Sequence, residues 1–140
     1  MTGVWQRLEP YRPVAIQFLK FGTVGFLGFF VDLAFLHIGL DMLNLGHYAS
    51  AYFSFPFAVT FTWLGNRLFT FRGQSQGSAH AEWMRFVTVS AGGLVLNRGT
   101  FSLLTRFVPL VYTYPSLGLL GGTAAGMFFN FFLSRRLVFR

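Results

Sequence analysis

A single carboxylate interrupts the first long apolar stretch of this chain, and an amide beside a guanidinium interrupts a later one. Asp32 lies near the middle of FGTVGFLGFFVDLAF (21–35), and Asn97 and Arg98 lie at the matching place in FVTVSAGGLVLNRGT (86–100). A charged side chain near the centre of a membrane helix costs roughly 2.5–3.5 kcal/mol and usually marks an ion pair or a polar pathway. Two interpretations therefore stand: Asp32 and Arg98 form a structural ion pair, or they line a polar groove.

Small residues precede both polar positions at helical spacing. A glycine or serine lies seven and four residues before Asp32, and again before Asn97, which places each set on one helical stripe. A stripe of small residues that ends in a polar group predicts a groove for an elongated ligand with a polar head. The small residues are Gly25, Gly28, Ser90 and Gly93.

The composition indicates that the main solvent of this chain is lipid. Of its 140 residues, 54% are hydrophobic, 11% are charged and 20 are phenylalanine, whereas ordinary soluble domains carry about 25% charged residues. The net charge of +7 comes from basic residues that flank long apolar runs, which is typical of membrane topology determinants and not of nucleic-acid binding. We expect no nucleic-acid partner, and no cleavable signal peptide in residues 1–17, which lack an apolar core.

Four apolar stretches are long enough to cross a bilayer, which takes roughly 20 helical residues. The predicted fold class is an all-α membrane protein with four transmembrane helices, in a single integral membrane domain over residues 1–140. Basic residues gather before the first stretch, around the loop at 70–85 and after the fourth. The positive-inside rule then places both termini and this loop in the cytoplasm. The predicted spans are about 18–40, 49–69, 86–108 and 114–133.

The two halves of the chain resemble each other, which predicts two repeated two-helix hairpins. At an offset of 65 residues Asp32 matches Asn97, and at an offset of 68 NRLFTFR (66–72) matches SRRLVFR (134–140). Repeat one covers about 18–72 and repeat two about 85–140. The offset of 68 also pairs helix-packing positions of the second and fourth spans: Ser50 with Gly118, Ser54 with Gly122, Ala58 with Gly126 and Thr62 with Asn130.

Basic and aromatic residues at the predicted cytoplasmic ends suit a phosphate and a sugar. Arg67 and Arg135 recur at one repeat position, with Asn130 close by, and arginine pairs bidentately with phosphate oxygens. We predict headgroup or ligand phosphate contacts here, although anchoring under the positive-inside rule would also place arginines at these ends. Trp63 could stack on a sugar ring or lie in the interfacial aromatic belt.

Catalysis and metal binding find little support in the sequence. The chain has no cysteine, and its three histidines are scattered without metal-ligand spacing. Glu9, Asp41 and Glu82 lie in flanks or at a loop edge, so no pair of carboxylates shares a span. We expect no enzyme activity, no catalytic residue, no metal and no cofactor.

Three motifs resemble the GtrA-like family of small membrane proteins. They are LKFGTVGFLGFFVD (19–32), NRLFTFR (66–72) and NFFLSRRLVF (130–139), so the likeness runs from about 18 to 139. Lys20 stands where arginine is common in the family, and Phe69 stands where tryptophan is common. Asp32, Arg67 and Asn130 match family positions, and these three are the residues whose role the resemblance implies.

The resemblance implies four transmembrane helices and a role in cell-surface polysaccharide synthesis. Members are thought to flip polyprenyl-phosphate-linked sugars, such as undecaprenyl-phosphate glucose, across the cytoplasmic (inner) membrane of bacterial or archaeal cells. A partner membrane glycosyltransferase would make the lipid-linked sugar. We expect this ligand, contacts with membrane lipid, and a homodimer or larger oligomer, because four short helices enclose little volume.

Two other functions remain open. The chain could be a scaffold that recruits a glycosyltransferase, as has been suggested for some family members, and then Asp32 and Arg98 would not matter for transport. It could also be a small proton-coupled multidrug exporter in which Asp32 binds a cation, although the neighbouring Arg98 would oppose this.

Overall fold

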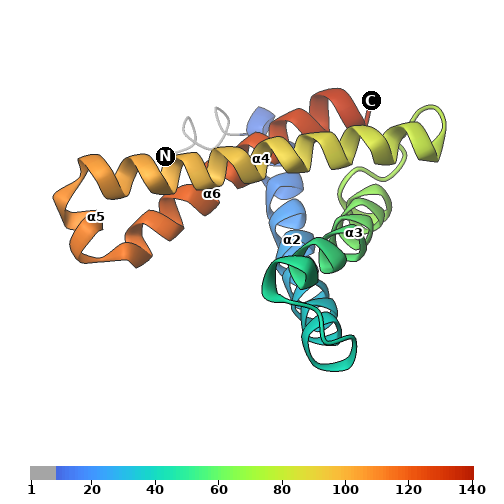
Figure 1. Cartoon of the computed structure of the whole chain (residues 1–140). Coiled ribbons are helices and arrows are strands. Elements are labelled where there is room, and N and C mark those ends of the chain that lie inside the picture. Colours follow the sequence, from blue (N-terminus) through green and yellow to red (C-terminus); the bar gives the residue numbers. More distant parts are fainter. Residues whose placement is uncertain (1–8) are drawn as a thin grey trace. The chain divides into compact units, whose positions relative to one another are not determined.

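The computed structural model describes residues 9–140 (Figure 1). All regular structure in this range is helical, so the predicted all-α class is confirmed. We predicted no signal peptide in residues 1–17, and residues 1–8 of that segment lie outside the described residues. The chain divides into two compact units, Met1–Gln74 and Ser75–Arg140, and each is described by itself.

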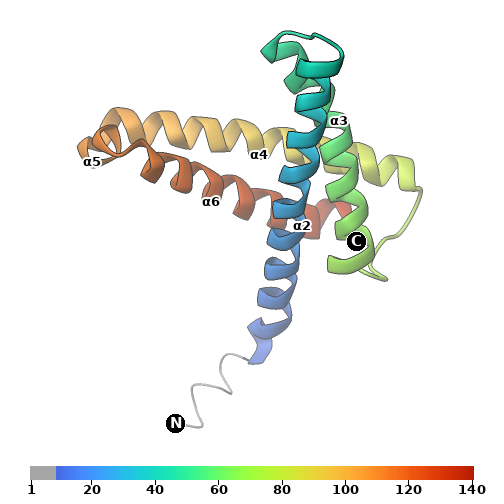
Figure 2. The ribbon, with the colours of Figure 1, turned by 90° about the horizontal axis from the view of Figure 1, so that it is seen from below.

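The first unit is built from two long antiparallel helices that lie side by side, α2 and α3 (Figures 1 and 2). Pro13 lies in the first turn of α2, where a backbone N–H has no acceptor within the helix, so its absence costs no hydrogen bond. Asn44 turns the chain between the helices with a φ of 52°. The elements are η1 (a 3-10 turn, Glu9–Tyr11), α2 (Arg12–His37), η2 (a π-helix, Ile38–Met42), α3 (His47–Gly65) and η3 (a π-helix, Asn66–Thr70).

Small and aromatic residues hold α2 and α3 together. A Cβ added to Gly39 would lie 3.1 Å from the Cα of Ser50, so the two backbones nearly touch near the connecting turn. At the other end of the hairpin, the rings of Phe21 and Phe71 meet edge to face with 6.3 Å between their centroids. Such close backbone contact is how helices associate in lipid, where burying apolar surface brings little gain.

The second unit has the same plan, with long antiparallel helices α4 and α6 joined through the short helix α5 (Figure 2). The Ser78 hydroxyl caps α4 by accepting a hydrogen bond of 3.2 Å from the Ala81 N–H. Prolines occupy the first turns of α5 and α6, again where their missing N–H does no harm. The elements are α4 (Ala79–Phe107), α5 (Pro109–Thr113), α6 (Pro115–Leu133) and η4 (a π-helix, Ser134–Val138).

A stripe of buried glycines on α6 packs against α4. The stripe consists of Gly118, Gly122 and Gly126. A Cβ on Gly122 would lie 2.6 Å from the carbonyl oxygen of Asn97, and a Cβ on Gly126 would lie 2.9 Å from that of Gly93. Because the obstructing atoms belong to backbone, no side-chain adjustment could make room, and glycine is required at both positions.

Matching local features occur in both units at the offsets of the sequence repeat. The π-helices η3 and η4, each of five residues, begin 68 residues apart. The ring pair of the second unit has 6.0 Å between centroids, close to that of the first. Three contacts correspond in this way: Phe21–Phe71 with Phe86–Phe139, Gly28–Thr62 with Gly93–Asn130, and Asp32–Ser54 with Asn97–Gly122.

The number of helices differs from the prediction of four. Within residues 9–140 there are five α-helices, because the expected turn at Pro109–Thr113 forms the short helix α5. Two helical segments are long and apolar enough to cross a membrane: Glu9–Met42, with a mean hydropathy of 1.8, and Pro115–Val138, with 1.4. The hydroxyls of α3, and Asn97 and Arg98 of α4, account for the lower apolarity of those helices. The four-span arrangement therefore stays a prediction.

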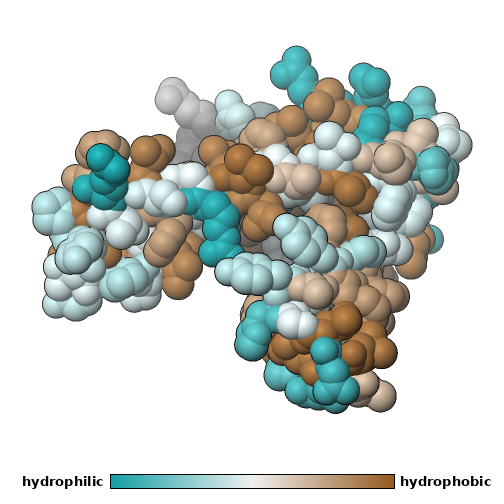
Figure 3. Space-filling view, in the orientation of Figure 1, coloured by the Kyte–Doolittle hydropathy of each residue, from teal (hydrophilic) through white to brown (hydrophobic). Residues whose placement is uncertain are grey.

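The two apolar segments are not core helices of a soluble domain. Only 17% of the apolar window in Glu9–Met42 and 22% of that in Pro115–Val138 are buried. Large side chains point outward, among them Phe26, which is 63% exposed, and Leu120, which is 67% exposed. Figure 3 shows apolar side chains on the outer surface of α2 and α3 towards their connecting turn. Exposed apolar surface of this kind is compatible with lipid contact.

Candidate polar sites of the two hairpins

The best-defined polar contact of the first hairpin joins α2 to α3. The Ser54 Oγ donates a hydrogen bond of 2.7 Å to Asp32 Oδ1. Ser54 is buried and Asp32 is half-buried, so the carboxylate is held at one oxygen and keeps part of its surface accessible. The sequence presented Ser54 only as a packing residue. Its place in the small-residue pattern, opposite the single intramembrane carboxylate, was the signal that could have identified this bond.

The corresponding place in the second hairpin holds an amide. Asn97 is half-buried and packs against Gly122 and Gly126, whereas its neighbour Arg98 is exposed. Asn97 therefore occupies the inward position that Asp32 has in the first hairpin, and Arg98 points to the outside of its own unit. Asp32 and Arg98 belong to different units, so an ion pair between them and a shared groove both stay predictions.

The Asn130 side chain occupies space that exists only because residue 93 is glycine. Its side-chain amide packs against Gly93, where any Cβ would collide with the amide atoms. The Oδ1 atom is buried and has no hydrogen-bond partner among the described residues. In the first hairpin, the matching Thr62 satisfies its hydroxyl on the carbonyls of its own helix, at 3.0 Å from Ala58 O. An unsatisfied buried acceptor costs roughly 1–3 kcal/mol and is rarely kept without a use.

A π-helix positions the predicted phosphate ligand Arg67. The Asn66 side chain donates to Thr62 O at 2.9 Å and accepts from the Thr70 hydroxyl at 2.7 Å, which fixes η3 at both ends. The Arg67 guanidinium lies over the Trp63 ring, 5.5 Å from its centroid. One face of Trp63 is thus covered by a cation, so the predicted sugar stacking would have to use the other face.

Arg135 has the same place in η4 that Arg67 has in η3. Both are half-buried, and Arg136 beside Arg135 is exposed. The residue that matches Trp63 is Phe131, which is fully buried in the second unit. The two repeat positions therefore keep the arginine and differ in the aromatic beside it.

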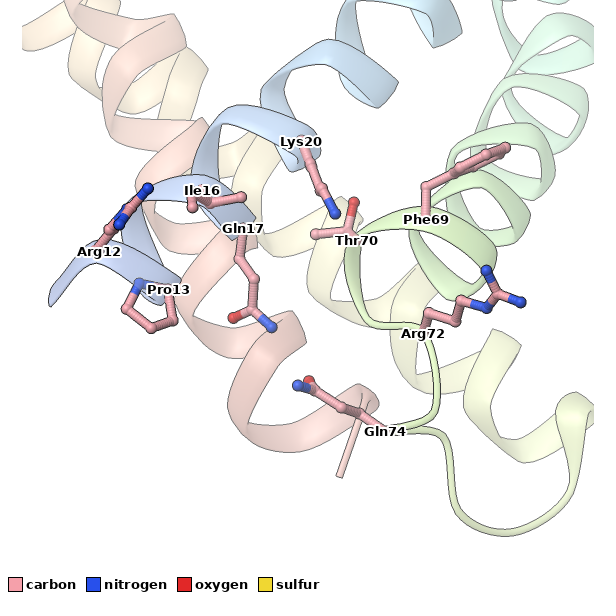
Figure 4. Close-up of a pocket in the computed structure, with 9 residues that line it drawn as sticks. All are labelled: Arg12, Pro13, Ile16, Gln17, Lys20, Phe69, Thr70, Arg72 and Gln74. Carbon is pink, nitrogen blue, oxygen red and sulfur yellow. The ribbon is translucent and has the colours of Figure 1, made fainter. Parts of the chain in front are cut away.

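A cavity of about 410 Å³ lies at the end of the first hairpin where α2 begins and η3 ends (Figure 4). Three of its lining residues are basic, and none is acidic. The sequence indicates topology determinants or lipid-headgroup contacts for these cations, but it does not show that α2 and the residues after η3 enclose a space. The lining residues are Arg12, Pro13, Ile16, Gln17, Lys20, Phe69, Thr70, Arg72 and Gln74.

A buried acid in the second unit was also missed. Glu82 lies in the first turn of α4 and is only 1% exposed. The positive end of the helix dipole favours a carboxylate in this turn. Within residues 9–140, no three His, Asp or Glu side chains gather in a group that could hold a metal ion.

Comparison with known proteins agrees with the resemblance found in the sequence. A family model described as GtrA/DPMS, transmembrane domain, matches residues 20–139. No curated protein matches the chain in sequence. The matched range contains α2, apart from its first residues, and every later helix, so it includes all of the predicted site residues.

Proposed function

Because this chain belongs to the GtrA/DPMS transmembrane domain family, we propose that it moves a polyprenyl-phosphate-linked sugar across the cytoplasmic membrane. Membership of this family makes it a membrane protein linked to the handling of glycosyl lipids. The finer proposal is flipping of the lipid-linked sugar, undecaprenyl-phosphate-linked in a bacterial cell, for the synthesis or modification of cell-surface polysaccharide. The protein would be multi-pass, with four spans and both termini in the cytoplasm.

The observation that carries this proposal is the half-buried Asp32, a carboxylate held by Ser54 between α2 and α3. Asp32 lies 12 residues beyond Lys20, which is about 18 Å along a helix and hence near mid-membrane. A polyprenyl tail can stay in lipid, whereas a sugar head needs hydrogen-bond partners on its way. One oxygen of Asp32 is engaged by Ser54, and the other can accept from sugar hydroxyls.

The remaining predicted residues would act in sequence along this path. Arg67 and Arg135 would receive the phosphate at the cytoplasmic ends, since guanidinium groups bind phosphate oxygens bidentately. Asn97 and Arg98 would contact the head deeper in the membrane, and the unpartnered Oδ1 of Asn130 would accept a hydrogen bond from a sugar hydroxyl. Downhill flux or an ion gradient would drive the net movement.

A scaffold that recruits a glycosyltransferase is the second candidate. The observation in its favour is the set of basic side chains at the open end of the first hairpin, which could bind an acidic partner surface. The scaffold needs the Asp32–Ser54 bond only for the association of α2 with α3 and gives no use to the accessible part of the carboxylate. A proton-coupled exporter of cationic drugs ranks third, with Asp32 as the cation-binding carboxylate.

Reconstituted liposomes test the proposal directly. We expect the Asp32→Asn/Arg98→Gln double variant to slow the movement of a fluorescent undecaprenyl-phosphate sugar by tenfold or more. The control is Asp41→Asn/Arg106→Gln, which removes the same two charges from exposed positions near helix ends. Equal transport by both variants and the parent chain would favour the scaffold, and protection against quaternary ammonium compounds that depends on Asp32 would favour the exporter.

A further inference from the structure

We propose that the cavity at the open end of the first hairpin is a binding site for a phosphate group. The identification of the natural ligand as the phosphate of a polyprenyl lipid rests on the proposed function. This site is separate from Arg67 and Arg135, which do not line it.

The lining places three cations around one space. Arg12 and Lys20 come from α2, and Arg72 follows η3. Among the described residues, none of the three has a hydrogen-bond or ion-pair partner for its side chain. Figure 4 shows the Lys20 side chain directed towards Thr70 across the cavity. Positive charges along the lining favour an anion as the ligand, and Figure 4 shows Arg12 and Arg72 on opposite sides of the cavity.

The other polar lining residues are neutral groups able to donate hydrogen bonds. Gln17 and Gln74 carry amide groups, and Thr70 carries a hydroxyl. The Gln17 Oε1 atom is buried without a partner among the described residues. Amide and hydroxyl donors complement cations in binding phosphate, because they supply hydrogen bonds without adding repulsion.

The second unit lacks the same combination at the corresponding place. At the repeat offsets, Gln17 matches the buried acid Glu82, and Thr70 matches Val138. Arg12 matches Gly77, so one cation is missing as well. A buried carboxylate in place of a neutral amide would repel phosphate. The two repeats have therefore diverged at this place, and the cationic, donor-rich form belongs to the first unit.

The apolar lining explains why the ligand would be a lipid. Pro13, Ile16 and Phe69 line the same cavity as the cations. Ile16 and Phe69 are 45% and 68% exposed, so apolar surface continues from the cavity to the outside of the hairpin. A volume of about 410 Å³ lies within the usual range of small-ligand pockets. A phosphate could occupy the polar part while the first isoprene units lie along the apolar part.

Binding to the full-length protein in detergent tests the site. The probe is radiolabelled undecaprenyl phosphate, and the competitors are unlabelled undecaprenyl phosphate, inorganic phosphate and the uncharged polyprenol. We expect Arg72→Gln to weaken binding about five- to tenfold, as removal of one basic contact to an anionic lipid does. Gln17→Glu, which copies the second unit, should weaken it further. Arg140→Gln is the matched control, because Arg140 has the repeat position of Arg72 in the unit without this cavity.

Each result bears on the proposal. If inorganic phosphate competes as well as the lipid, the site is a phosphate site whose natural ligand is soluble. If only the lipid competes, the ligand is the lipid headgroup. The phosphate site would be overturned if polyprenol competed as well as undecaprenyl phosphate does. It would also be overturned if the Arg72→Gln and Arg140→Gln variants bound the probe equally well. If the parent chain binds the lipid but does not move it across liposomes, the proposed function is contradicted and the binding site is not.

Discussion

Ser54 donates a hydrogen bond of 2.7 Å to Asp32 across the interface of α3 with α2. The bond is the polar centre of a hairpin whose other helix contacts are made by glycines and aromatic rings. It gives the carboxylate a fixed orientation and leaves Asp32 half-buried rather than sealed. A residue held in this way can serve both helix association and ligand binding, and the two contributions can be measured separately.

Replacing Ser54 by alanine should destabilise the first hairpin by about 1–2 kcal/mol. A hydrogen bond to a charged group contributes roughly 1.5–3 kcal/mol in proteins, whereas interhelical hydrogen bonds in a membrane average about 0.6 kcal/mol. The measurement is a double-mutant cycle of Ser54→Ala and Asp32→Ala on the free energy of unfolding in mixed micelles. If Ser54→Ala costs the same with aspartate and with alanine at position 32, the bond contributes nothing.

The glycine stripe of α6 should tolerate no methyl group opposite the α4 backbone. We expect Gly122→Ala to lower the free energy of unfolding by about 1–3 kcal/mol, the usual range for overpacking, because its Cβ would lie 2.6 Å from Asn97 O. Gly99→Ala is the control, since a Cβ there meets open space in the middle of α4. That change should be neutral or stabilising by up to about 1 kcal/mol. Equal losses from both substitutions would show that the stripe is not in contact.

The all-α class and the approximate positions of the long helices could be predicted from the sequence. Long apolar runs predict membrane helices, and the basic residues beside them mark where these helices end. The predicted span at 18–40 is extended to Arg12 in α2, since Pro13 starts a helix as readily as it breaks one. The short helix α5 was missed, because a segment bounded by prolines looks like a turn until its hydrogen bonds are known.

The contacts of the candidate sites were not accessible in the same way. The Asp32–Ser54 bond joins residues 22 positions apart, so it depends on the register between two helices, which apolar periodicity does not fix. The cationic cavity depends on where α2 begins relative to the end of η3. The sequence shows the basic residues at this end of the hairpin, but only the three-dimensional arrangement shows that Arg12, Lys20 and Arg72 line one cavity.

Asn130→Thr separates packing from transport in the second hairpin. Threonine already fills the matching place in the first hairpin, where Thr62 faces Gly28 and bonds to its own helix. We therefore expect the free energy of unfolding to change by less than about 1 kcal/mol, a tolerance typical of well-accommodated substitutions. Lipid-linked sugar movement should fall about tenfold, which corresponds to about 1.4 kcal/mol, because a hydroxyl bonded to its own helix replaces the unpartnered amide oxygen. Unaltered movement would remove Asn130 from the proposed path.

Arg67→Lys tests whether the recurring arginine of the π-helices binds phosphate through its shape or only through its charge. Lysine keeps the positive charge but has no planar fork for bidentate phosphate binding, and it stacks less well on Trp63. We expect movement of the lipid-linked sugar in liposomes to fall about five- to tenfold. Arg136→Lys is the control, because Arg136 is exposed in η4, and it should transport like the parent chain. If both substitutions leave transport unchanged, Arg67 acts as a topology determinant, and the phosphate must be received elsewhere at the membrane surface.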